Sequence, residues 1–170
     1  KMTSLSSYTI SFWMFMIDDF FSSIKGNRLC PLLQKGRDDI VSNNYRRSPA
    51  IILDRKTKQL KIYLSTTKLN SVEGENFVSN SRIFNQRWIH IALIKNKNKV
   101  ALLVNGVIDT EFVLQGGPVD DTGDLYLGGV KWLSGFCQFP FLIDELKYFN
   151  DAVDFNIIQA ESSGVLAGLQ

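Results

Sequence analysis

The chain has 170 residues, of which 45% are hydrophobic and 21% are charged, and its formal net charge is +2. This length suits one folded domain with a sizeable core and leaves no room for a second full domain. A net charge close to neutral, with scattered basic residues, points away from nucleic acid and from an anionic membrane as main partners. No hydrophobic stretch is long enough to span a bilayer.

The first predicted element is a strand over residues 8–16, which is rich in β-branched and aromatic residues. Because successive side chains point to opposite faces, Phe12 and Met14 share one face while Ser11 and Trp13 share the other. Both faces are fairly apolar, which predicts an interior strand of a sheet.

The next segment alternates between short strands and polar loops. Residues 32–36 form a short strand that ends at a glycine, and the polar residues 35–48 are expected to be a loop. Residues 50–54 and 59–64 are predicted to pair as a hairpin. The polar residues 66–80 are expected to form another loop.

The C-terminal half is predicted to hold five more strands and one helix. The strands span residues 88–94, 100–104, 107–114, 124–127 and 139–149. Asn105-Gly106 is a strong hairpin signal, because both residues accept positive φ. Many short strands separated by turns predict a sandwich or barrel.

The end of the chain carries the one helical pattern. Within residues 151–169, a stripe of apolar residues predicts a helix of about two turns. The sequence begins at Lys1, and we expect residues 1–170 to be a single domain excised from a larger multidomain protein. Residues 162–170 are interpreted as a linker to a following domain.

In this order the motifs resemble the laminin-G-like, or concanavalin A-like, jelly-roll family. The pieces that carry the likeness are Tyr-Thr-Ile-Ser-Phe-Trp at 8–13, Leu-Leu-Gln-Lys-Gly at 32–36, Trp-Ile-His-Ile-Ala at 88–92, Leu-Val-Asn-Gly at 103–106, and the closing pair 125–129 and 141–150. The resemblance implies an all-β antiparallel sandwich with one short C-terminal helix. It also implies a non-catalytic binding module, extracellular or on the cell surface, for a glycan or a protein.

Calcium is the cofactor to consider, since relatives often carry it at the rim of the sandwich. Calcium takes six to eight oxygen ligands from carboxylates and carbonyls. Asp120, Asp121 and Asp124 gather three carboxylates in one turn-rich loop, and we predict a calcium site there. The alternative is that Asp and Gly simply favour turns.

A glycan site would use exposed aromatic and polar side chains on loops. Trp132, in the loop 129–135, and Tyr45, beside Arg46 and Arg47, are the candidates. The two arginines would suit sulfated or sialylated sugars. The alternative for Trp132 is that it covers an edge of the core.

Cys30 and Cys137 lie far apart and outside any Cys-x-x-Cys pair, so a zinc site is not expected. They form either one disulfide that closes a long loop or two separate buried thiols. His90, the only histidine, is interpreted as a hydrogen-bonded core residue rather than as a ligand. Asp144-Glu145 interrupts an apolar strand, and alternation predicts that one of the two points inward or toward an edge.

Catalytic residues are not expected. A glycosidase needs two carboxylates about 5–5.5 Å or about 6.5–9.5 Å apart, and the chain lacks the family's runs of spaced Glu and Asp. Asp109 and Glu111 would share one face, but of a solvent-edged strand. A nucleophile elbow and a phosphate-binding loop are also missing. The remaining alternatives are a structural spacer that binds nothing small and an intracellular scaffold domain.

Overall fold

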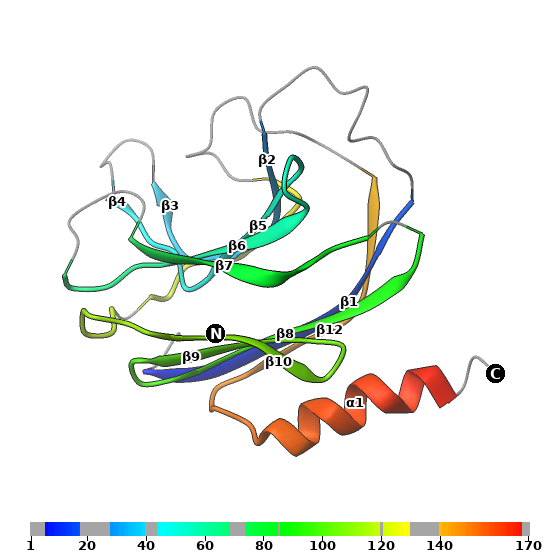
Figure 1. The fold of residues 1–170 in the computed structure, drawn as a ribbon. Coiled ribbons are helices and arrows are strands. Elements are labelled where there is room, and N and C mark those ends of the chain that lie inside the picture. Colours follow the sequence, from blue (N-terminus) through cyan, green and yellow to red (C-terminus); the bar gives the residue numbers. More distant parts are fainter. Residues whose placement is uncertain are drawn as a thin grey trace.

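The computed structural model describes residues 6–17, 28–39, 44–68, 74–84, 86–119, 121–129 and 140–167. Within them, two five-stranded antiparallel sheets lie face to face (Figure 1). The helix-side sheet has the order β10 (Val107–Val113), β9 (Lys99–Val104), β8 (Trp88–Asn96), β1 (Ser7–Met16) and β12 (Phe141–Phe149). The opposite sheet has the order β11 (Leu125–Leu127), β2 (Leu29–Lys35), β5 (Ala50–Asp54), β6 (Gln59–Leu64) and β7 (Glu75–Arg82). The predicted antiparallel β-sandwich is therefore confirmed.

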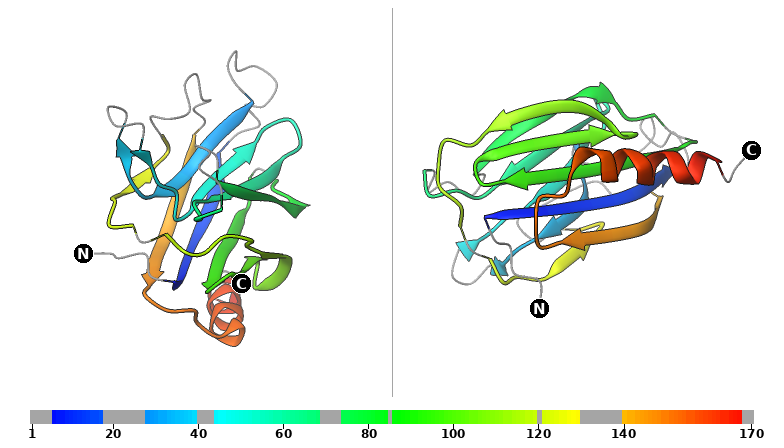
Figure 2. Two further views of the ribbon diagram at one scale, coloured as in Figure 1. Left: turned by 90° about the vertical axis from the view of Figure 1, so that its left-hand side faces the viewer. Right: turned by 90° about the horizontal axis from the view of Figure 1, so that it is seen from below.

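The core lies between the two sheets and follows from the alternation of each strand. In β1, Ile10, Phe12 and Met14 face the opposite sheet and are fully buried. The other face of β1 is buried as well, because helix α1 (Phe155–Ala167) crosses the outer side of the helix-side sheet (Figure 2, right). Strand β1 pairs with both β8 and β12, so its predicted interior position is confirmed.

Two segments expected as loops contain strands. Residues 75–82, which begin within the expected loop 66–80, form β7, which pairs with β6. Its inward positions include Glu75, Phe77 and Ser79, so polar residues hide the alternation that normally predicts a strand. The expected loop 35–48 contains a two-stranded ribbon of β3 (Asp38–Asp39) and β4 (Asn44–Tyr45).

Of the two positions expected for Asp144 or Glu145, inward or toward an edge, the inward one is wrong, and β12 lies at the edge of the helix-side sheet. Both side chains are exposed. The pairing of β1 with β12 shifts register between Ser11 and Trp13, and Glu145 takes a φ of 48°. This β-bulge adds one residue and restarts the alternation, so that neither carboxylate enters the core.

Helix α1 has 13 residues and is therefore longer than the two turns expected. Its start is set by Asp154, whose Oδ1 accepts a hydrogen bond from the Asn156 amide at 2.8 Å, as an N-cap does. Residues 162–167 of the expected linker lie in this helix, and residues 168–170 lie outside the described residues. In the part of the chain that the structure describes, no helix has the length and apolar character needed to cross a membrane.

Candidate functional site

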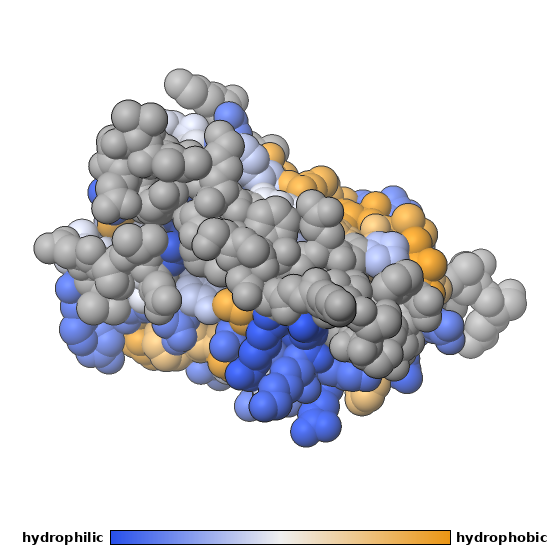
Figure 3. All heavy atoms as spheres, turned by 90° about the horizontal axis from the view of Figure 1, so that it is seen from above, coloured by the Kyte–Doolittle hydropathy of each residue, from blue (hydrophilic) through white to orange (hydrophobic). Residues whose placement is uncertain are grey.

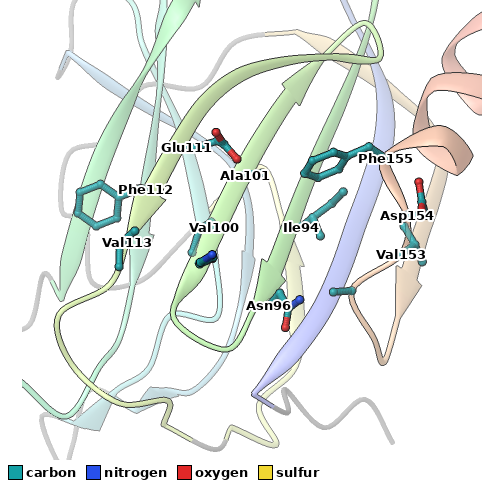
Figure 4. Close-up of a pocket in the computed structure, with 12 residues that line it drawn as sticks. Ile94, Asn96, Val100, Ala101, Glu111, Phe112, Val113, Val153, Asp154 and Phe155 are labelled. Atoms are coloured by element: carbon teal, nitrogen blue, oxygen red, sulfur yellow. The ribbon is translucent and has the colours of Figure 1, made fainter.

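A pocket of about 540 Å³ lies on the outer side of the helix-side sheet, where the chain leaves β12 and enters α1 (Figure 4). We call it the outer-face pocket. Strands β8, β9 and β10 form one side of it, and the connector residues 152–154 with the start of α1 form the other. Its size lies within the range of about 300–1,000 Å³ that is typical of ligand sites.

The register of β8, β9 and β10 determines which side chains form the floor and one edge of this pocket. Ile94 pairs with Ala101, and Glu111 pairs with Ala101 from the other side, so these outward side chains form one row. Ile94 and Ala101 are nearly fully buried and make an apolar floor. Glu111 stands at its exposed edge. One step along the strands, Lys99 pairs with both Asn96 and Val113 and continues the lining.

The opposite wall is held in place by Thr9. The Thr9 hydroxyl donates to the Asp151 carbonyl at 2.9 Å and accepts from the Val153 amide at 3.0 Å. This fixes the connector over the sheet, and the Phe155 side chain, which is 40% exposed, reaches toward Ala101 and Ile94 (Figure 4). The pocket is thus lined by one open aromatic ring and several aliphatic side chains.

Few polar side chains line the pocket, and they include both positively and negatively charged ones. Lys99, Glu111 and the amide of Asn96 are exposed at its rim. Among the described residues, no ion pair joins Glu111 to Lys99. Such a lining fits a ligand that has an apolar face and hydrogen-bonding groups at its edge. Sequence reasoning missed the pocket, because its residues are ordinary strand residues that only the register brings together.

A second polar group lies under α1 and contains His90, which is 2% exposed. The carboxylate of Glu161 on α1 accepts from Lys147 Nζ at 3.0 Å and from Ser11 Oγ at 3.4 Å. His90 Nε2 lies 4.0 Å from Glu161 Oε2, and its ring meets Trp13 edge-on with ring centroids 5.0 Å apart. His90 Nδ1 has no hydrogen-bond partner. The predicted burial of His90 is correct, but hydrogen bonds of its imidazole do not explain it.

The predicted calcium loop is tied to β2. Asp121 is buried, and its carboxylate accepts hydrogen bonds from the amides of Gly123 at 2.7 Å and Arg37 at 3.2 Å. The buried Lys35 donates to the carbonyls of Asp121 and Gly123 at 3.4 and 3.3 Å. Asp124 is exposed. Asp120 lies outside the described residues, and within the described ones no three metal-ligating side chains are gathered.

Of the predicted glycan residues, the structure describes the side chains of Arg46 and Arg47 only. Arg47 is fully buried, with its guanidinium 5.8 Å from the centre of the Tyr63 ring, whereas Arg46 is half-buried. The Tyr45 side chain and all of Trp132 lie outside the described residues. On the face seen from above, hydrophobic atoms of the described residues gather at the upper right and in another group at the lower left (Figure 3). Cys30 is buried in the core; the pairing with Cys137, which is not described, stays a prediction.

Asp109 and Glu75 carry carboxylates, the groups on which a glycosidase depends. In this chain, both carboxylates connect the two sheets. Asp109 lies at a register shift of β10 and accepts from the amides of Asn80 and Ser81 in β7, each at 2.7 Å. Glu75, on β7, accepts from the amides of Gln115 at 2.7 Å and Gly116 at 3.0 Å, just after β10. We call these contacts the carboxylate ties. Because of the shift, Asp109 does not repeat the outward position of Glu111.

The chain matches one protein family, described as the concanavalin A-like lectin/glucanases superfamily and of the laminin G type, over residues 1–158. Trypanosoma rangeli sialidase in complex with sialic acid superposes with a TM-score of 0.65 at 14% identity, over 96% of this chain and 24% of that chain. A mutant of HCR/D superposes with a TM-score of 0.70 at 10% identity, over 95% of this chain and 38% of that chain. The chain therefore spans less than half the length of either structure, and at these identities the likeness concerns the fold alone. No curated protein sequence matches the chain.

Proposed function

Because the chain belongs to the laminin-G-like group of the concanavalin A-like lectin/glucanase superfamily, we propose that it is a non-catalytic binding module of a secreted or cell-surface protein. Its ligand is a glycan, which places a sugar residue in the outer-face pocket. A sugar ring has a C–H face that packs on Phe155 and Val113, and hydroxyl groups that bond to Glu111, Asn96 and Lys99. The observation that carries the proposal is this combination of an apolar floor with a polar rim.

The carboxylate ties support a non-catalytic role. A general acid or a nucleophile must have its carboxyl group directed at the substrate. Asp109 and Glu75 instead bond to backbone amides of the neighbouring sheet or loop. Their geometry is that of structural acceptors, because each of the two oxygens of each carboxylate accepts a hydrogen bond from a backbone amide.

Phe155→Ala is expected to weaken glycan binding at least tenfold, because the substitution removes the aromatic wall of the pocket. Ile157→Ala is the matched control: Ile157 lies on the same helix, is 49% exposed and does not line the pocket. Binding is measured on an array of neutral, sulfated and sialylated glycans, followed by titration of the best hit by calorimetry. If both variants bind as tightly as the original chain, the glycan does not bind in the outer-face pocket. If the array gives no hit, the proposal that the ligand is a glycan is wrong.

Calcium at the loop of Asp120, Asp121 and Asp124 remains a separate prediction. Binding to the folded state alone would stabilise it by about 2.7 kcal/mol at a hundredfold excess over Kd. The expected result is a higher Tm in calcium than in EDTA, and the loss of that difference in Asp124→Asn, whose side chain is exposed. An identical Tm in calcium and EDTA would contradict the prediction, and Asp121 would then be a structural residue only.

A further inference from the structure

Between residues 155 and 164, where its side chains are described, helix α1 is fastened to the sandwich by few residues. From Phe155 to Gly164 only Ile158 and Ser162 are buried, and Glu161 is partly buried. Ile158 packs against four outward side chains of β8 and β9, namely Ala92, Ile94, Ala101 and Leu103. At the turn between β9 and β10, Gly106 leaves just enough room for Ser162. The other side chains of residues 155–164 are exposed, so that within this stretch the docking of α1 depends on Ile158, Ser162 and Glu161.

The polar point of attachment is Glu161, which lies directly over His90. Lys147 and Ser11 bond to the Glu161 carboxylate, while His90 Nε2 lies beyond hydrogen-bond distance at 4.0 Å. The charged groups that face His90 are Glu161 from α1 and the pair Lys147 and Glu145 from β12. Beside His90, strand β1 contributes the Trp13 ring and the β9–β10 turn contributes the Asn105 amide group, both of which are uncharged.

This site suits a neutral imidazole and not an imidazolium. A protonated His90 would carry an Nδ1–H with no acceptor in a place that is 2% exposed. Desolvation by burial lowers the pKa of His90 below its usual 6.5, the carboxylate of Glu161 opposes this, and the ammonium of Lys147 adds to it. With the folded pKa lowered, stability is lost as the pH falls from about 6.5 through the folded pKa.

We propose that α1 is a strap that leaves the sheet when His90 takes up a proton, and that its departure removes one wall of the outer-face pocket. Water reaches the imidazolium most simply if the element above it lifts, and that element is α1. The connector stays in place because Thr9 holds Asp151 and Val153. Phe155 moves with the helix, so ligand is released in acid. The release of α1 stands on its own; only its effect on the ligand rests on the proposed function.

Hydrogen exchange of the α1 amides, corrected for the intrinsic pH dependence of exchange, tests the strap directly. Between pH 7.5 and pH 5.5 we expect the protection of α1 to fall at least tenfold, while β8 and β9 keep theirs. His90→Gln removes the titrating group and is expected to abolish this difference. Asp144→Asn is the matched control, at an exposed carboxylate of β12 that bonds to the amide of its neighbour Glu145, and it should behave as the original chain does.

A second measurement needs no variant. His90 is the only histidine of the chain, so its imidazole resonance is assigned without mutation. The midpoint of its NMR titration must coincide with the midpoint of α1 exchange, and glycan affinity must fall over the same pH interval. Unchanged or stronger protection of α1 in acid would overturn the strap, as would two separate midpoints. Release of α1 without a change in glycan affinity would support the strap but contradict the proposal that the glycan binds in the outer-face pocket.

Discussion

Gly36→Ala is expected to destabilise the fold by about 3 kcal/mol, from backbone strain and from steric overlap together. Gly36 has a φ of 139°, which a residue with a Cβ rarely adopts. A Cβ there would meet the Arg46 carbonyl oxygen and lie 2.6 Å from Asp121 Oδ2. The Gly36 amide also donates to the Asp124 carbonyl at 2.9 Å. Alanine would therefore push apart three segments that meet at the end of β2.

Gly164→Ala provides the control, because Gly164 lies in α1 and a Cβ added there has no atom within 4 Å. In a helix this exchange is expected to stabilise by up to about 1 kcal/mol. The free energy of unfolding is measured by urea titration monitored by circular dichroism. A loss below about 0.5 kcal/mol in Gly36→Ala would show that the chain end of β2 rearranges freely, and the close packing described at Gly36 would then be wrong.

The second large effect is expected at the carboxylate ties. The double variant Glu75→Gln/Asp109→Asn should lose about 3 kcal/mol at pH 7, since hydrogen bonds to a charged acceptor contribute about 1.5–3 kcal/mol each. Each carboxylate accepts two backbone amides from a neighbouring strand or loop. A neutral amide side chain offers one acceptor atom where the carboxylate offers two.

The pH dependence gives this prediction a second readout. Burial works to raise the pKa of Glu75 and of Asp109, but their hydrogen bonds together hold the pKa of each below its usual value. A depressed folded pKa means that the stabilisation is present at neutral pH and is lost as the pH falls through the folded pKa. The original chain should therefore lose stability below about pH 4.

The double variant should show a flatter profile in acid, so that the two stabilities converge once both carboxyl groups of the original chain are protonated. The exchange Asp144→Asn is the control, because Asp144 is exposed and bonds only to the amide of its neighbour Glu145. Urea titrations between pH 2.5 and pH 7 measure the difference. A constant gap between the double variant and the original chain across this range would contradict an electrostatic origin.

The sequence predicted the architecture because the long strands are rich in β-branched and aromatic residues or end at strong turn signals. Alternation in residues 8–16 and the Asn105-Gly106 turn both correspond to what the structure contains. Strand β7 was not predicted because its inward positions include Glu75 and Ser79, which are polar residues at buried positions. The bulge at Glu145 was also missed, because the prediction took the alternation of faces to run unbroken through Asp144 and Glu145, whereas the extra residue restarts it there.

Residue types and spacing by themselves determined that this chain is a β-sandwich of a known family with no recognisable catalytic set. Only the tertiary structure decided where a ligand can lie and which charged side chains are buried or exposed. The outer-face pocket joins β8 to α1 across a long stretch of sequence, and Arg47 turned out to be buried while Glu111 is open. Burial, strand register and the placement of α1 depend on contacts between residues distant in the chain, and local sequence carries no record of those contacts.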